Sequence, residues 1–190
     1  MNKSTSLLFG SLFLLSACGG TTETATCAND YWNGTVGTCV PAEWTVIDET
    51  VMAQRGIEAI DQVVVAFESE KAVSGQFPRV AITEETLAQE MTALEFSEAS
   101  IRSVVGVAGY EELDTKEVTV AGEGVKLHVF SAQPDEGQPK QRFYQLGTVS
   151  GSTGYAVTGM APLSIDENLE REILILILGL TFTEQVEVVE

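Results

Sequence analysis

The sequence contains a single histidine, His128, and this scarcity excludes much of the chemistry that proteins build on imidazole. A zinc site made of several histidines and a mechanism that needs two histidines are both excluded. The chain also lacks the Cys-x-x-Cys motif of thioredoxin-like redox centres and the Gly-x-Ser-x-Gly elbow that carries the nucleophile of many hydrolases. We therefore expect a non-catalytic protein without a metal site or a cofactor.

Positive charge is also sparse, because 10 lysines and arginines stand against 28 aspartates and glutamates, for a net charge of −18. Nucleic acid is excluded as a partner, since neutralising phosphates requires a basic face. Direct adhesion to anionic lipid is disfavoured for the same reason. Acidic clusters such as Glu84-Glu85 and Glu111-Glu112 are expected to form solvated surface, because a chain this acidic produces such clusters by composition alone.

No apolar run is long enough to span a bilayer as a helix. The apolar stretch 7–15 follows Lys3 and has the length of a secretory signal, so residues 1–17 are predicted to be an export signal. The segment Leu15-Ser16-Ala17-Cys18 resembles the lipobox of bacterial lipoproteins, whose cysteine receives lipid and becomes the new N-terminus. The resemblance implies a membrane anchor on Cys18; the alternative is an ordinary signal peptide cut near Ala17.

The residues after Cys18 extend this prediction. Gly19 stands where an aspartate would retain a lipoprotein at the inner membrane, and this resembles the outer-membrane class facing the periplasm, if the organism is Gram-negative. Residues 18–26 are small and polar, as in a flexible tether. Removing residues 1–17 takes away only Lys3, so the mature protein would carry nine basic and 28 acidic residues and a net charge of −19.

The other two cysteines, Cys27 and Cys39, form an even pair in an exported protein and would close a loop of 13 residues. Asn33-Gly34 between them is a strong signal for a two-residue hairpin turn. We therefore predict a small hairpin over residues 27–40, closed by a Cys27–Cys39 disulfide. The main domain is predicted over residues 41–184, with an acidic tail at 185–190.

Hydrophobic periodicity in the main domain predicts two strands, a helix, two strand hairpins and a final helix. The predicted strands cover residues 62–68, 78–83, 117–121, 125–132, 141–149 and 155–160, with glycine-rich turns at 122–124 and 151–154. One helix is expected to begin at Thr83 and to end before Gly106, and another is expected to begin at Ser164, in a capping-box pattern with Glu167, and to reach residue 178. This order predicts an α+β domain with an antiparallel sheet.

Several segments in this order resemble the PsbP-like superfamily, in particular its DcrB-related bacterial lipoproteins. They are Pro41-x-x-Trp44, Val80-x-Ile82-Thr83-Glu84-Glu85, Arg142-Phe143-Tyr144-Gln145, Gly154-Tyr155-Ala156-Val157-Thr158 and the closing Ile-Leu helix. The resemblance covers residues 41–184 and implies a central antiparallel sheet with helices on both faces. It also implies an accessory or protein-binding module and carries over no active site.

Two functions remain open at this point: a module that binds another envelope protein, and a small envelope hydrolase or ligand carrier that uses carboxylates and His128. Aromatic and basic residues on two strands suggest where a partner would bind. If the strands are neighbours, Lys126, Lys140 and Arg142 fall in a small region beside aromatic rings. This predicted binding face comprises Lys126, His128, Phe130, Arg142 and Tyr144. The alternative is that Phe130 and Tyr144 pack under a flanking helix while the basic groups lie at the edge.

Overall fold

The computed structural model describes residues 26–48, 50–51, 62–133 and 137–184. Two antiparallel sheets are present in this part of the chain. The small sheet pairs β1 (Cys27–Trp32) with β2 (Gly37–Pro41). The large sheet has the order β3-β4-β5-β9-β8-β7-β6, and its strands are β3 (Trp44–Ile47), β4 (Val63–Ser69), β5 (Arg79–Thr86), β6 (Glu111–Val120), β7 (Glu123–Ala132), β8 (Gln141–Ser150) and β9 (Thr153–Pro162).

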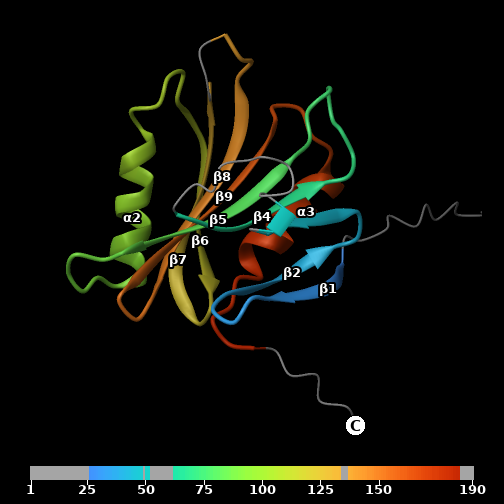
Figure 1. Ribbon diagram of the computed structural model, residues 1–190. Helices are drawn as coiled ribbons and strands as arrows, with labels where there is room; N and C mark the ends of the chain where they lie inside the picture. The colour runs from blue at the N-terminus through green and yellow to red at the C-terminus, as the bar shows by residue number, and fades with distance from the viewer. Residues whose placement is uncertain (1–25, 49, 52–61, 134–136, 185–190) are drawn as a thin grey trace, which may run out of the picture.

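Two helices cover opposite faces of the large sheet, as Figure 1 shows. Helix α2 (Ala93–Val104) lies over β7 and β8, and α3 (Glu167–Leu178) lies over β5 and β9 on the other side. The packing is close enough to require glycine on both faces. A Cβ on Gly147 would lie 3.1 Å from the Cβ of Ser100, and a Cβ on Gly159 would lie 2.8 Å from Ile173. The predicted fold class, an antiparallel sheet with helices on both faces, is confirmed.

Most of the apolar core lies between the large sheet and α3. Alternate residues of β4 and β5 point to this side, including Val65, Phe67 and Ile82, which are fully buried. Ile173 and Ile177 of α3 meet them and are fully buried as well. We call this side of the sheet the α3 face and the opposite side the α2 face.

The predicted start of the first helix at Thr83 is wrong. Residues Thr83 to Thr86 belong to β5, where they pair with Ala156 to Thr153 of β9. The helix begins after Thr92, whose hydroxyl accepts a hydrogen bond from the amide of Glu95 while the Glu95 carboxylate accepts one from the amide of Thr92. Pairing with β9 therefore keeps the chain extended past the apparent cap.

Other boundaries differ by smaller amounts. Helix α3 is capped by Asp166 rather than Ser164, because the Asp166 carboxylate accepts hydrogen bonds from the amides of Asn168 and Leu169. Strand β6 begins at Glu111, six residues before the predicted start, because its pairing with β7 continues as far as Ser131. Strand β3 was not predicted at all.

The β1–β2 hairpin turns at Asn33-Gly34 as predicted, but through the four residues 33–36 rather than two, and it is joined to the rest of the domain. Asn33 Oδ1 accepts hydrogen bonds from the amides of Thr35 and Val36, and Gly34 has a φ of 99°. Strand β2 packs against α3, where the Thr38 hydroxyl donates to the carbonyl of Leu176 at 2.7 Å. The hairpin thus covers part of α3.

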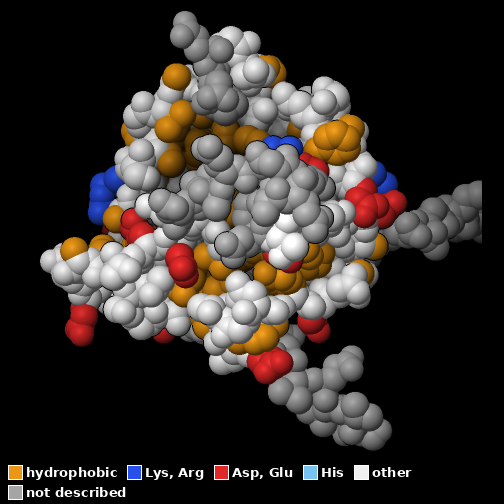
Figure 2. Space-filling model, in the orientation of Figure 1, with side chains coloured by type: hydrophobic (Ala, Val, Ile, Leu, Met, Phe, Trp, Pro, Cys, Tyr) orange, Lys and Arg blue, Asp and Glu red, His pale blue; other side chains and the backbone are white. Residues whose placement is uncertain are grey.

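The surface agrees with the acidic composition. On the face shown in Figure 2, carboxylates are spread around the margin, and the few basic side chains lie apart from one another. Neither described helix is long and apolar enough to cross a membrane. The export signal 1–17, Cys18, the tether up to residue 25 and the tail 185–190 lie outside the described residues.

Candidate functional site

The residues of the predicted binding face do not share a surface. Strands β7 and β8 are neighbours, as that prediction required, but His128 lies opposite Gln145, and Tyr144 lies opposite Val129. Because residues directly opposite one another share a face of the sheet, His128 is on the α2 face and Tyr144 is on the α3 face. Lys126 and Phe130 accompany His128, and Arg142 accompanies Tyr144. The two halves of the predicted face are therefore separated by the sheet.

The aromatic members are buried and the basic members are paired. Phe130 and Tyr144 are 3% and 1% exposed, so neither ring is available to a partner. Each basic side chain has a carboxylate partner: Lys126 with Glu98 at 2.7 Å, Lys140 with Glu111 at 3.4 Å, and Arg142 with Glu170 at 3.7 Å. These residues therefore fit the alternative, in which the rings of Phe130 and Tyr144 are packed inside the protein, better than they fit a binding face.

Tyr144 links the sheet to α3. Its hydroxyl donates a hydrogen bond to Glu170 Oε1 at 2.9 Å and lies 3.4 Å from an Arg142 guanidinium nitrogen. Burial of the ring raises the pKa of Tyr144 to about 12, so the hydroxyl keeps its proton at neutral pH. These contacts fix α3 on the sheet and give Tyr144 a structural role.

His128 is fully buried in a stack of rings on the α2 face. Its ring centroid lies 5.2 Å from that of Phe130 and 6.0 Å from that of Tyr110. The Nε2 atom is 3.0 Å from the Tyr110 hydroxyl, and Nδ1 is 2.8 Å from the Thr115 hydroxyl. Two neutral hydroxyls suit a neutral imidazole, and burial lowers the pKa of His128. Both ring nitrogens are occupied, so the ring does not offer a free base to a substrate.

This environment predicts a pH dependence of stability. The unfolded chain protonates His128 near its ordinary pKa of about 6.5, whereas the folded protein protonates it only at a lower pH. Stability from this group is therefore complete above about pH 6.5 and decreases as the pH falls from there towards the lowered pKa. Urea unfolding between about pH 7.5 and pH 5.5 should show a shallower decrease for His128→Gln than for the wild-type protein. Equal slopes would contradict the assignment.

Helix α3 exposes an apolar stripe that the sequence did not identify as a surface. Leu169, Ile173, Leu176 and Ile177 are buried, while Leu174 and Ile175 are half-buried and Leu178 is 37% exposed. Together with Arg171, these three apolar residues, Leu174, Ile175 and Leu178, follow helical spacing and line a hollow beside Cys39 and Gly179. We call Arg171, Leu174, Ile175 and Leu178 the α3 stripe. The signal in the sequence was the run 173–178, which is apolar on every side of a helix.

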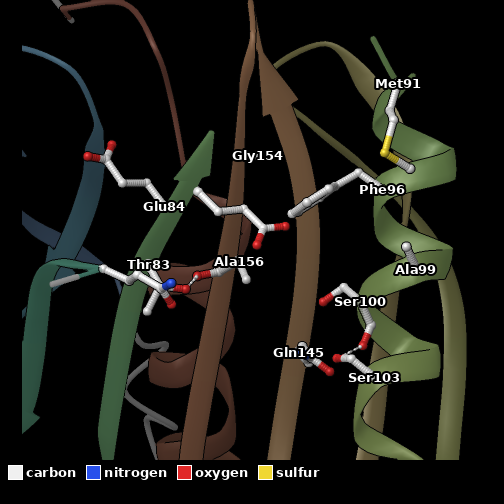
Figure 3. Close-up of a pocket in the computed structure, with 12 residues that line it drawn as sticks. Thr83, Glu84, Met91, Phe96, Ala99, Ser100, Ser103, Gln145, Gly154 and Ala156 are labelled. Atoms are coloured by element: carbon white, nitrogen blue, oxygen red, sulfur yellow. Dashed lines mark hydrogen bonds between the residues drawn. The ribbon is translucent and has the colours of Figure 1, made fainter. Parts of the chain in front are cut away.

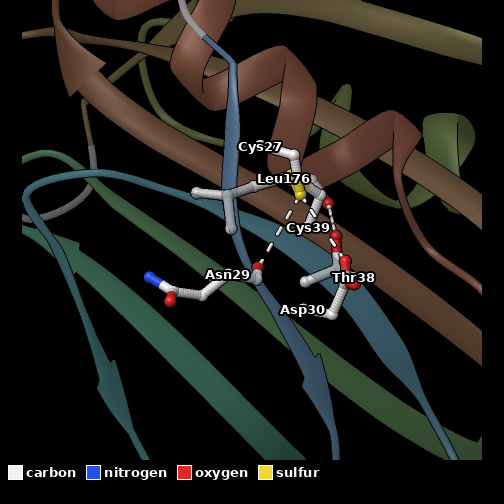
Figure 4. The surroundings of a disulfide bond; sticks show 6 residues. All are labelled: Cys27, Asn29, Asp30, Thr38, Cys39 and Leu176. Carbon is white, nitrogen blue, oxygen red and sulfur yellow. Dashed lines mark hydrogen bonds between the residues drawn. A yellow bond between two sulfur atoms is a disulfide. The ribbon is translucent and has the colours of Figure 1, made fainter. Parts of the chain in front are cut away.

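A disulfide lies at the edge of the α3 stripe. Cys27 and Cys39 are bonded, as predicted, with their Cα atoms 5.4 Å apart. In Figure 4 the disulfide lies close to Thr38 and to Leu176 of α3. Cys27, the first residue of β1, therefore lies next to the α3 stripe.

A second region is a cavity of about 280 Å³ between α2 and the sheet. Its walls come from β5, β8, β9 and α2, and Figure 3 shows Phe96, Ser100 and Gln145 on its two sides. No sequence motif indicated this cavity, because its walls come from four separate segments of the chain.

Comparisons with known proteins establish the fold. Neither protein-family profiles nor curated protein sequences match the chain. Among solved structures, cyanobacterial PsbP (CyanoP) from Synechocystis sp. PCC 6803 is similar with a TM-score of 0.53 and 10% identity, over 89% of this chain and 99% of that one. The Ran-binding protein Mog1p of Saccharomyces cerevisiae has a TM-score of 0.53 and 9% identity, over 81% of this chain and 95% of that one.

The similarity to these two structures concerns the arrangement of the strands and helices. At this level of identity the similarity shows the fold alone. The chain has the PsbP-like α+β fold, as the sequence resemblance implied.

Proposed function

We propose that this protein is a lipid-anchored, non-catalytic module of the bacterial cell envelope that binds another envelope protein through the α3 stripe. The observation that carries the proposal is the stripe itself, an apolar row on the outer side of a helix whose inner side is already buried. A helix on the surface of a monomer normally has a polar outer face. Apolar surface rimmed by polar residues is typical of protein interaction sites.

The position of the stripe fits a tethered protein. Cys18 precedes Cys27 by nine residues, and an extended chain of that length reaches at most about 32 Å. Cys27 is bonded to Cys39, which lines the same hollow as the α3 stripe. Lipid on Cys18 would therefore hold the stripe close to the membrane, where other envelope proteins are concentrated.

The net negative charge of the chain favours a protein, rather than the membrane surface, as the partner that covers the α3 stripe. A net charge of −18 repels anionic headgroups, so the stripe is poorly suited to adhere to lipid directly. A protein with an apolar patch and basic residues around it would gain from both the stripe and the acidic surroundings. Mog1p, which shares the fold, is described as a Ran-binding protein, so protein binding is compatible with this architecture.

Site-specific crosslinking tests the proposal. A photoreactive benzoylphenylalanine in place of Leu178, in the full-length protein in its own envelope, should give a protein adduct on irradiation. The same residue in place of Leu94 on α2, which is 43% exposed against 37% for Leu178, is the matched control and should give none. Adding Ile175→Glu should reduce the adduct at position 178 by about tenfold or more, because it places a charge in the centre of the stripe.

Three outcomes would contradict the proposal: an adduct with lipid alone, an adduct with a second copy of this chain, or equal adducts at positions 178 and 94. The melting temperature of Ile175→Glu, measured by circular dichroism, checks that loss of the adduct does not come from unfolding.

A further inference from the structure

The cavity between α2 and the sheet contains a buried polar atom without a partner. Gln145 of β8 is 8% exposed, and its Oε1 atom has no hydrogen-bond partner. Figure 3 shows the side chain reaching from β8 towards Ser103 of α2, in the wall of the cavity. Leaving a buried amide oxygen unpaired costs about 1–3 kcal/mol, so a donor that reached this atom would be favoured.

Two further hydroxyls in the walls, those of Ser103 and Thr83, can also accept hydrogen bonds, whereas the Ser100 hydroxyl and the Gln62 amide can donate as well as accept. The Ser103 hydroxyl donates to the Ser100 carbonyl at 2.7 Å, and the Thr83 hydroxyl donates to the Ala156 carbonyl at 3.3 Å. Each hydroxyl has thus used its proton and keeps free lone pairs. Glu85 lies opposite Gly154 in the β5–β9 pair, which places its carboxylate at the rim on the α2 face. Glu84, the next residue along, points away from the cavity (Figure 3).

The remaining walls are apolar. The Phe96 ring of α2 packs directly on Gly154 of β9, where a Cβ would lie 2.4 Å from it. Ala99 and Ala156 line the cavity beside this contact, and Met91 lies at one end. No lysine or arginine lines the cavity among the described residues. A ligand with hydrogen-bond donors and positive charge at one end and an apolar body at the other would therefore suit these walls.

From this arrangement we propose that the cavity is a binding site for a small organic ammonium ion. The N–H groups donate to Gln145 Oε1 and to the neighbouring hydroxyl oxygens, and Glu85 attracts the charge at the entrance. The hydrocarbon part packs against Phe96 and Ala99. A cavity of about 280 Å³ lies near the lower end of the range for ligand sites, so the ligand has about ten non-hydrogen atoms or fewer. This site is independent of the α3 stripe and lies on the other face of the sheet.

Titration with 2-phenylethylammonium tests the proposal, because its ring and amine match the two ends of the cavity. Heteronuclear NMR of the folded domain should show saturable shifts at the amides of Ala99, Ser100 and Ala156, with a Kd of about 1 mM or tighter. The neutral analogue 2-phenylethanol and the anion 3-phenylpropanoate should bind at least about tenfold more weakly, because both lack the charged donor.

Substitutions test whether 2-phenylethylammonium binds in the cavity rather than elsewhere on the protein. Gln145→Leu should weaken 2-phenylethylammonium binding by about tenfold or more, since it removes the acceptor at similar volume. Thr148→Val is the matched control and should leave binding unchanged, because Thr148 also carries a buried hydroxyl without a partner but lies on the α3 face. If Gln145→Leu does not fold, Ala99→Leu provides a second test, because the larger side chain enters the cavity from α2 and should abolish binding.

The proposal is overturned if 2-phenylethylammonium gives no saturable shifts, or if the alcohol or the anion binds equally well. It is also overturned if neither Gln145→Leu nor Ala99→Leu weakens binding.

Discussion

Replacing Cys18 by serine is expected to move the protein almost completely from the membrane fraction to the soluble fraction. The expectation follows from Leu15-Ser16-Ala17-Cys18, in which the cysteine would receive the lipid. A serine at this position cannot carry a thioether-linked lipid, and the net negative charge disfavours direct adhesion to anionic membranes. Fractionation followed by a high-salt wash and immunoblotting measures the result.

The control for this experiment is Thr21→Ser, which changes a hydroxyl residue in the tether just beyond the lipobox and should leave the protein in the membrane fraction. Mass spectrometry of the N-terminal peptide should find acyl chains in this control and none in Cys18→Ser. If Cys18→Ser still sediments with membranes after the wash, the anchor lies elsewhere. If the α3 stripe alone held the protein to membranes, Ile175→Glu rather than Cys18→Ser would release it.

The sequence predicted the order of elements well because the signals for strands and turns are local. Asn33 and Gly34 lie in the four-residue turn of the β1–β2 hairpin, and the glycines around residues 122 and 151 join the strand pairs β6–β7 and β8–β9. Each of these features depends on the preferences of a few adjacent residues. Such preferences do not require knowledge of the rest of the fold.

The start of helix α2 was predicted wrongly because two nearby segments, at Thr83 and at Thr92, both resemble a helix N-terminus. Thr83 is followed by acids, as a helix start often is, but Thr92 has Glu95 three residues later and completes a capping box. That pattern was visible in the sequence and could have located the helix correctly. What the sequence did not show was that β9 would pair with β5 as far as Thr86.

The predicted binding face failed for a reason that no single strand reveals. Alternation within β7 correctly placed Lys126, His128 and Phe130 together. Whether Tyr144 joins them depends on the register between β7 and β8, and a shift of one residue would reverse the answer. Register is set by the whole sheet and its turns. The cavity beside Gln145 could not be predicted from the sequence either, because its walls depend on how β5, β8, β9 and α2 are placed relative to one another.

Removing the disulfide should produce a large loss of stability. The bond closes a loop of 13 residues between Cys27 and Cys39, and the chain-entropy model assigns such a bridge about 3 kcal/mol. The bonded hairpin also holds β2 against α3, where Thr38 donates to Leu176 and Gly37 pairs with Thr181. We therefore expect the double variant Cys27→Ser, Cys39→Ser to unfold at a lower urea concentration, with a free energy of unfolding lower by about 3 kcal/mol.

Reduction provides the matched control for this prediction. Dithiothreitol should lower the urea midpoint of the wild-type domain towards that of the double variant and should leave the double variant unchanged. Equal midpoints for the oxidised wild type and the double variant would show that the bridge adds nothing to stability. Val36 and Val40 of the hairpin are buried in the main core, so we expect the double variant to keep a single cooperative transition. A separate early transition would instead show that the hairpin unfolds independently, and that its contacts with α3 do not couple it to the sheet.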